Sequence, residues 1–84
     1  MMNKLLLSDL QPNDKAIICG HDVSSNVYVR LLEMGFSSGT LLQVVKCAPF
    51  DGPMEIKIRG RNIVLRKSEA KCIRILQVIQ NVIK

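Results

Sequence analysis

One short cluster carries the side chains best suited to binding a metal ion. Cys19, His21 and Asp22 lie within four consecutive positions of the chain. A thiolate, an imidazole and a carboxylate can each coordinate Fe²⁺ or Zn²⁺, although a complete site needs further ligands and supporting hydrogen bonds from elsewhere. The alternative is a loop histidine beside a buried cysteine. The cluster therefore indicates a candidate site for Fe²⁺, while nothing in the sequence requires a cofactor.

The rest of the sequence contains no set of residues typical of an enzyme. No pair of carboxylates is placed for acid and base catalysis, and His21, the single histidine, has no evident nucleophile to activate. The GxxxxGK[ST] loop that binds nucleotide phosphates is also missing. We therefore expect that the chain is not an enzyme. It could still modulate a GTPase by supplying an arginine in trans, with Arg59 or Arg61 as candidates.

Length and charge indicate a small basic domain. With 84 residues we expect one domain over residues 1–84, with a core over about 7–76 and a C-terminal tail over 77–84. The net charge of +5 comes from basic residues scattered among strand-like segments. Aromatic residues that could stack on bases are not interleaved with them. Nucleic acid is therefore an unlikely partner on this pattern.

Cysteine spacing and the length of apolar runs indicate the environment of the chain. Cys19, Cys47 and Cys72 form no CxxC pair, so neither a zinc finger nor a disulfide framework is predicted. The first residues lack the cleavage site of a signal peptide, and no apolar run approaches the ~20 residues of a membrane helix. We expect a soluble, cytoplasmic chain with no direct membrane insertion.

Alternating and β-branched segments predict a mainly β fold. The clearest alternation is MEIKIR, residues 54–59, whose apolar side chains would face inward, and residues 60–61 would form a tight hairpin turn. Ser24 or Ser25 would cap a helix of about three turns that ends near Met34. These elements predict a small β-barrel of about five strands with one inserted α-helix. The predicted strands cover residues 15–20, 40–48, 54–59, 62–66 and 72–76.

Several spaced motifs resemble the FeoA family. RLLEMGFSSGT, residues 30–40, matches the family pattern R-L-x-E-[LM]-G-[FL]-x-x-G-T at every fixed position. Gly52-Pro53 before a strand, the segment 60–66 and the pair Glu69-Ala70 follow in the order that the family has. The resemblance spans roughly residues 7–75, which is nearly the whole chain.

This resemblance implies an SH3-like β-barrel and a role in bacterial ferrous iron uptake. Proteins of the family accompany FeoB, a membrane transporter with a cytoplasmic GTP-binding domain. The resemblance therefore implies a cytoplasmic accessory or regulatory protein that acts by contact with a FeoB-like transporter. A related domain forms part of iron-dependent repressors. The alternative is thus a Fe²⁺-binding sensor or regulator domain that uses Cys19, His21 and Asp22.

The predicted helix and hairpin carry the candidate partner-binding residues. They are Val29, Arg30, Leu32, Glu33, Arg59 and Arg61. For Arg30 and Glu33 the alternative is a local ion pair across one helical turn. Apolar residues of the helix and the tail could meet a partner or a second copy of the chain, as in a homo-oligomer, or could complete the small core. These are Val29, Leu32, Val78 and Val82.

The remaining motif residues are expected to be structural. Gly35 would end the helix, Gly39 would turn the chain into the next strand, and Phe36 between them would enter the core. The full set of structural motif residues is Gly35, Phe36, Gly39, Gly52, Pro53 and Gly60.

Overall fold

The computed structural model describes residues 4–78, which form six strands, two short α-helices and one 3₁₀ turn. In chain order the elements are β1 (Lys4–Leu6), η1 (Leu7–Asp9), β2 (Lys15–His21), α1 (Tyr28–Glu33), β3 (Leu41–Cys47), β4 (Met54–Ile58), β5 (Arg61–Leu65), α2 (Lys67–Ala70) and β6 (Ile73–Val78).

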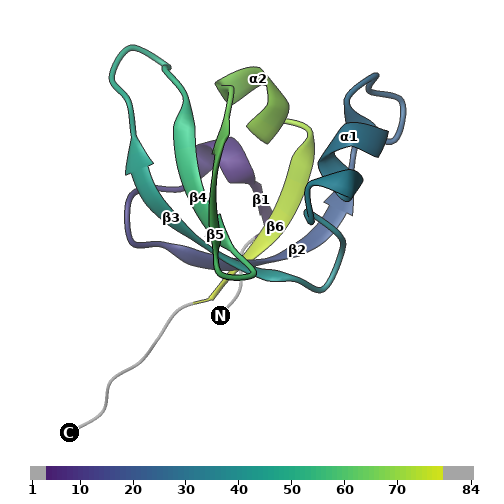
Figure 1. The fold of residues 1–84 in the computed structure, drawn as a ribbon, viewed down its shortest axis with the longest axis horizontal. Coiled ribbons are helices and arrows are strands. Elements are labelled where there is room, and N and C mark those ends of the chain that lie inside the picture. The colour runs from purple at the N-terminus through teal and green to yellow at the C-terminus, as the bar shows by residue number, and fades with distance from the viewer. Residues whose placement is uncertain (1–3, 79–84) are drawn as a thin grey trace, which may run out of the picture.

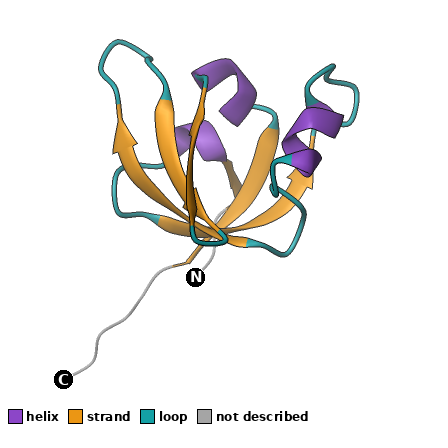
Figure 2. Ribbon diagram, in the orientation of Figure 1, coloured by secondary structure: helices purple, strands orange, loops and turns teal. Residues whose placement is uncertain are grey.

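The six strands form one antiparallel sheet in the order β1-β6-β2-β3-β4-β5. The sheet bends strongly, so that β3, β4 and β5 enclose an interior together with β2 and β6 (Figure 1). The helix α2 lies at one end of this interior, and α1 lies beside β2 and β6 (Figure 2). The predicted mainly β fold is confirmed, with β1 as an additional strand at the edge next to β6.

The strand β4 and the turn after it follow from local sequence. Met54, Ile56 and Ile58 are buried, as the alternation predicts, because successive side chains of a strand point to opposite faces. The hairpin turn lies at Arg59–Gly60, one residue earlier than predicted. Both residues have positive φ, 52° and 77°, which is the conformation of the tight turn that best fits the twist of two antiparallel strands.

The helix α1 is shorter than predicted because the residues before it form a turn. The Oδ1 atom of Asp22 accepts hydrogen bonds from the backbone N–H of Ser24, at 3.1 Å, and from its hydroxyl, at 2.6 Å. The Ser25 hydroxyl accepts from the N–H of Val27 at 3.2 Å. Because these short polar side chains already form hydrogen bonds within the turn, none of them caps the helix. The helix α1 therefore begins at Tyr28 without a side-chain cap.

The C-terminal end of α1 has the hydrogen bonds of a Schellman motif. The N–H of Phe36 donates to the carbonyl of Leu31, and the N–H of Gly35 donates to the carbonyl of Leu32, both at 3.0 Å. Gly35 has a φ of 104°, which favours glycine. This geometry turns Phe36 back toward Leu31, and both side chains are fully buried, as expected for Phe36.

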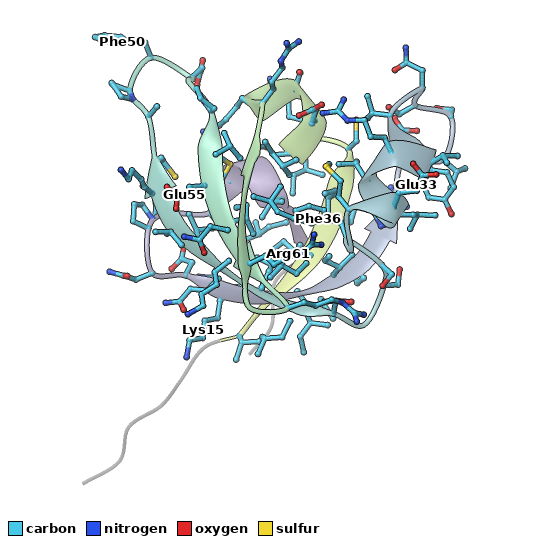
Figure 3. All side chains as sticks on the ribbon, in the orientation of Figure 1. Lys15, Glu33, Phe36, Phe50, Glu55 and Arg61 are labelled. Carbon is cyan, nitrogen blue, oxygen red and sulfur yellow. The ribbon has the colours of Figure 1, made fainter. Side chains whose placement is uncertain are left out.

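The core is built mainly from aliphatic side chains around Phe36. Its buried members come from every strand except β1, and from η1, α1, α2 and the connections. Figure 3 shows Phe36 in the interior and Phe50 at the tip of the β3–β4 loop, projecting into solvent. Among residues 4–78, no helix has the length and apolar character needed to cross a membrane.

The two phenylalanines give a matched test of this core. Phe36 is 0% exposed and Phe50 is 100% exposed. We expect Phe36→Ala to lower the free energy of unfolding by about 3–5 kcal/mol, through lost burial and a residual cavity. Phe50→Ala should change it by less than about 0.5 kcal/mol. Urea unfolding of both variants tests this, and similar losses for both would contradict the placement of Phe36.

Candidate functional site

The helix α1 presents most of the candidate partner-binding residues to solvent. Leu31 is its buried residue, Leu32 is half-buried, and Glu33 is exposed. Val29 is 62% exposed. Figure 3 shows Glu33 on the side of α1 that is turned away from the sheet. The exposed side of α1 therefore combines an apolar side chain with an acidic one.

Arg30 connects α1 to α2. Its Nη1 atom lies 2.8 Å from Oε2 of Glu69, whose side chain is only 7% exposed. The other carboxylate oxygen of Glu69 accepts a hydrogen bond from the N–H of Arg66 at 2.9 Å, at the start of α2. The local ion pair between Arg30 and Glu33 is thus not formed. Arg30 instead neutralises a buried carboxylate, which would be costly to leave without a partner.

The tip of the β4–β5 hairpin lies against the connection from α1 to β3. The Nη2 atom of Arg61 donates to the carbonyl of Met34 at 2.9 Å, and Nη2 of Arg59 donates to the Thr40 hydroxyl at 3.3 Å. Met34 is the C-terminal cap residue of α1. Arg61 therefore satisfies a carbonyl that the end of a helix leaves free, and its positive charge suits that end of the helix dipole.

These contacts place the β4–β5 hairpin next to the C-terminal end of α1, so five of the six candidate partner-binding residues belong to two neighbouring segments. We call this set the α1 surface, and it consists of Val29, Leu32, Glu33, Arg59 and Arg61. The sixth residue, Arg30, has its guanidinium on Glu69. The α1 surface combines two apolar side chains with one acidic side chain and two arginines.

The candidate metal ligands are not gathered around one point. Cys19 is exposed at a bulge of β2, where the register with β6 shifts between Ile18 and Gly20. His21 is buried, 7% exposed, and both of its ring nitrogens lack a hydrogen-bond partner. Its ring instead packs edge-on against Tyr28, with ring centroids 5.4 Å apart.

Asp22 completes the predicted ligand set and takes part in the turn before α1. The pKa of its carboxyl lies below the ordinary value, first because the Ser24 hydroxyl donates to it, then because the Ser24 N–H does, with a smaller effect of the positive charge of Arg74. Among residues 4–78, no three His, Cys, Asp or Glu side chains are close enough together to hold a metal ion. The metal site therefore stays a prediction.

The structural motif residues lie in the connections between helices and strands. Gly39 and Gly60 have positive φ. Gly52 is needed for a different reason: a Cβ atom at this position would lie 2.7 Å from the Cβ of Ala48. The preceding turn carries Phe50 and Asp51, both with positive φ, and Pro53 leads into β4.

Sequence reasoning missed the part that Glu69 plays. The motif Glu69-Ala70 was recognised, and its acidic residue at the third position of a short helix could have suggested a hydrogen bond back to the helix start. Its contact with Arg30 joins segments far apart in the chain, and no local pattern reveals such a pair.

Comparisons with known proteins agree with this architecture. The family model described as FeoA domain matches residues 5–76. A curated relative, the Fe(2+) transport protein A/Fe(2+) transporter FeoB fusion protein of Porphyromonas gingivalis, is 35% identical over 75 residues. That alignment covers 89% of this chain and 9% of the relative, so the chain spans less than a tenth of the length of the curated relative that it matches.

Two solved structures show the same fold. The FeoA-like protein from Clostridium acetobutylicum has a TM-score of 0.88 and 27% identity, with 100% of this chain and 98% of that chain covered. The zinc complex of Stenotrophomonas maltophilia FeoA has a TM-score of 0.73 and 28% identity, with 84% and 88% covered. The latter is described as a procaryotic SH3 domain protein, and the predicted SH3-like fold class is confirmed.

The ion pair between α1 and α2 can be tested by a double-mutant cycle. We expect Arg30→Met and Glu69→Gln to be coupled by about 0.5–1 kcal/mol in the free energy of unfolding, a modest value because the Arg30 side chain is 58% exposed. Glu69→Ala should cost more, about 1–3 kcal/mol, because the N–H of Arg66 also loses its acceptor. Glu33→Gln is the control, and stronger coupling of Arg30 to Glu33 than to Glu69 would refute the assignment.

The lowered pKa of Asp22 predicts a pH-dependent contribution to stability. A carboxyl whose pKa is lower in the folded state stabilises the fold above its ordinary pKa, and this contribution is lost as the pH falls through the folded value. The destabilisation caused by Asp22→Asn should therefore be present at pH 7 and shrink steadily in the acid range. Urea unfolding over this range tests it. The same substitution in a Ser24→Ala background should have a smaller effect, and a difference that grows in acid would contradict the assignment.

Proposed function

The chain belongs to the FeoA domain family, whose members act in ferrous iron transport, and from that premise we propose that it is a cytoplasmic accessory protein that binds a FeoB-like transporter. The observation that carries the proposal is the fusion protein, in which a segment 35% identical to this chain belongs to the same polypeptide as a transporter. Fusion keeps two domains at high effective concentration, which is useful when they work in contact.

We assign the transporter contact to the α1 surface. Val29 supplies exposed apolar area, and arginine is among the residues that contribute most to protein interfaces. Arg59 and Arg61 are already held by hydrogen bonds to Thr40 and Met34, so less side-chain entropy is lost on binding. The guanidinium groups keep further donors for a carboxylate of the partner.

The position of α1 also supports this assignment. Its C-terminal end is fixed by the bonds of Gly35 and Phe36, and its middle is tied to α2 through Arg30 and Glu69. A contact surface on an element held in this way needs little rearrangement when it binds. The alternative of a Fe²⁺-binding sensor or regulator stays a prediction, and the described arrangement of Cys19, His21 and Asp22 gives it no added support.

The proposal is tested by binding and by iron uptake. The purified chain should bind the cytoplasmic part of the FeoB-like transporter from the same organism, and Val29→Asp should raise the Kd at least about tenfold, because it places a charge at the apolar centre of the contact. Val64→Asp is the matched control, since Val64 on β5 is also 62% exposed. Its Kd should stay within about twofold of the native value.

In cells, deletion of the gene should reduce Fe²⁺ uptake, and the Val29→Asp variant should restore uptake less well than Val64→Asp. Unchanged uptake after deletion, together with no detectable binding to the transporter, would overturn the proposed function. Equal loss of binding in both valine variants would not affect the proposal that the transporter is the partner. It would overturn only the assignment of the contact to the α1 surface.

A further inference from the structure

The strand β5 is an open edge of the sheet. It pairs with β4 on one side, and the sheet order ends there. An edge strand presents backbone N–H and C=O groups that can pair with another strand. The opposite edge, β1, has 3 residues, whereas β5 has 5. The longer edge is therefore the one whose free backbone groups need an explanation.

The register shows which groups of β5 face outward. The two-residue turn joins Ile58 to Arg61, and the residues that flank such a turn exchange hydrogen bonds with each other. The bonded pairs then recur at every second residue, so Ile63 pairs with Ile56. Asn62 and Val64 therefore turn their backbone N–H and C=O groups away from β4.

The hydrogen bonds of the neighbouring β3–β4 ladder also indicate which residues of β5 direct their backbone groups away from β4. The backbone N–H and C=O of Val44 bond to Asp14 and Asn13, on the side away from β4. Its partner across the β3–β4 ladder, Ile56, must then direct its own backbone groups toward β5. Within residues 4–78, no hydrogen bond from a turn, loop or side chain reaches the outward groups of Asn62 or Val64.

The strand β5 lacks most of the features that usually protect an edge strand, and its one charged residue, Arg61, directs its guanidinium to the carbonyl of Met34. Its sequence, RNIVL, contains neither lysine nor proline, and its ladder with β4 has no bulge, whereas β2 and β3 each have one. The Asn62 side chain does not cover the edge, because its Nδ2 atom donates to Oε2 of Glu55 at 2.7 Å on the outer face of the sheet. Val64 is 62% exposed.

We infer that β5 pairs with β5 of a second copy of this chain, antiparallel, about a two-fold axis at Ile63. In this register Asn62 of the first copy lies opposite Val64 of the second, and Val64 of the first copy lies opposite Asn62 of the second. The two outward-facing residues of each copy thus satisfy one another, with four hydrogen bonds between the copies. No other register of two such edges pairs all the outward groups.

The side chains are compatible with this arrangement. Ile63 is half-buried on the inner face of β5 and would meet its counterpart at the axis, where closely spaced side chains favour β-branched pairs. Arg61 would lie opposite Leu65, so no like charges face each other. A pairing of two short strands buries less area than a standard interface, and we expect a Kd of about 0.1–1 mM.

The test uses the chain alone, so its outcome is independent of the proposed function. Sedimentation equilibrium should show a monomer–dimer equilibrium. Val64→Lys should raise the dimer Kd at least about tenfold by placing two charges at the paired edges, whereas Val29→Lys, with the same starting residue and exposed fraction, should leave it within about twofold. Val64→Pro, which removes the outward donor without touching the β4 ladder, should act like Val64→Lys.

Hydrogen exchange gives a second readout that does not depend on a variant. The amides of Asn62 and Val64 should gain protection as the protein concentration rises, whereas that of Ile63, already paired with β4, should stay unchanged. A monomer up to about 2 mM, at least about twice the expected Kd, would overturn the inference. So would a dimer that Val29→Lys and Val64→Lys weaken equally, or one that forms without protecting these two amides.

Discussion

The arrangement of this small domain depends on how α1 ends. A helix of 6 residues has little stability of its own and must be held by its neighbours. Gly35 allows the chain to reverse, the N–H of Phe36 bonds back to Leu31, and the aromatic ring enters the core. The same few residues therefore end the helix, provide the largest buried side chain and direct the chain into β3. The glycines and the phenylalanine of the motif RLLEMGFSSGT are thus structural, and its helical part exposes Arg30 and Glu33.

Three further contacts hold the short helix α1 in position. Asp22 organises the turn before it, Arg30 joins it to the buried carboxylate of Glu69, and Arg61 bonds the carbonyl of Met34 at its end. Each contact comes from a different part of the chain, which links the position of α1 to the sheet, to α2 and to the β4–β5 hairpin. A surface that is already held by such contacts loses less conformational entropy when it binds a partner.

The sequence predicted the features that depend on local patterns. The alternation in β4, the burial of Phe36 and the glycine at the helix end each arise from residues close together in the chain. The strand β1 was missed because its 3 residues become a strand only by pairing with β6 at the other end of the domain. The predicted start of α1 was wrong because hydrogen bonds of Ser24 and Ser25 within a turn replaced a cap. The partner of Arg30 was missed because tertiary folding, rather than helical spacing, selects Glu69.

The central claim is that α1 and the hairpin tip form the surface that meets the transporter. The most direct measurement is a backbone amide NMR titration of the labelled chain with the cytoplasmic part of a FeoB-like transporter. We expect the amide chemical shifts of residues 28–34 and 59–61 to change, while those of the β3–β4 loop around Phe50 stay unchanged. Changes centred on that loop, or on β5 alone, with α1 unaffected, would contradict the claim.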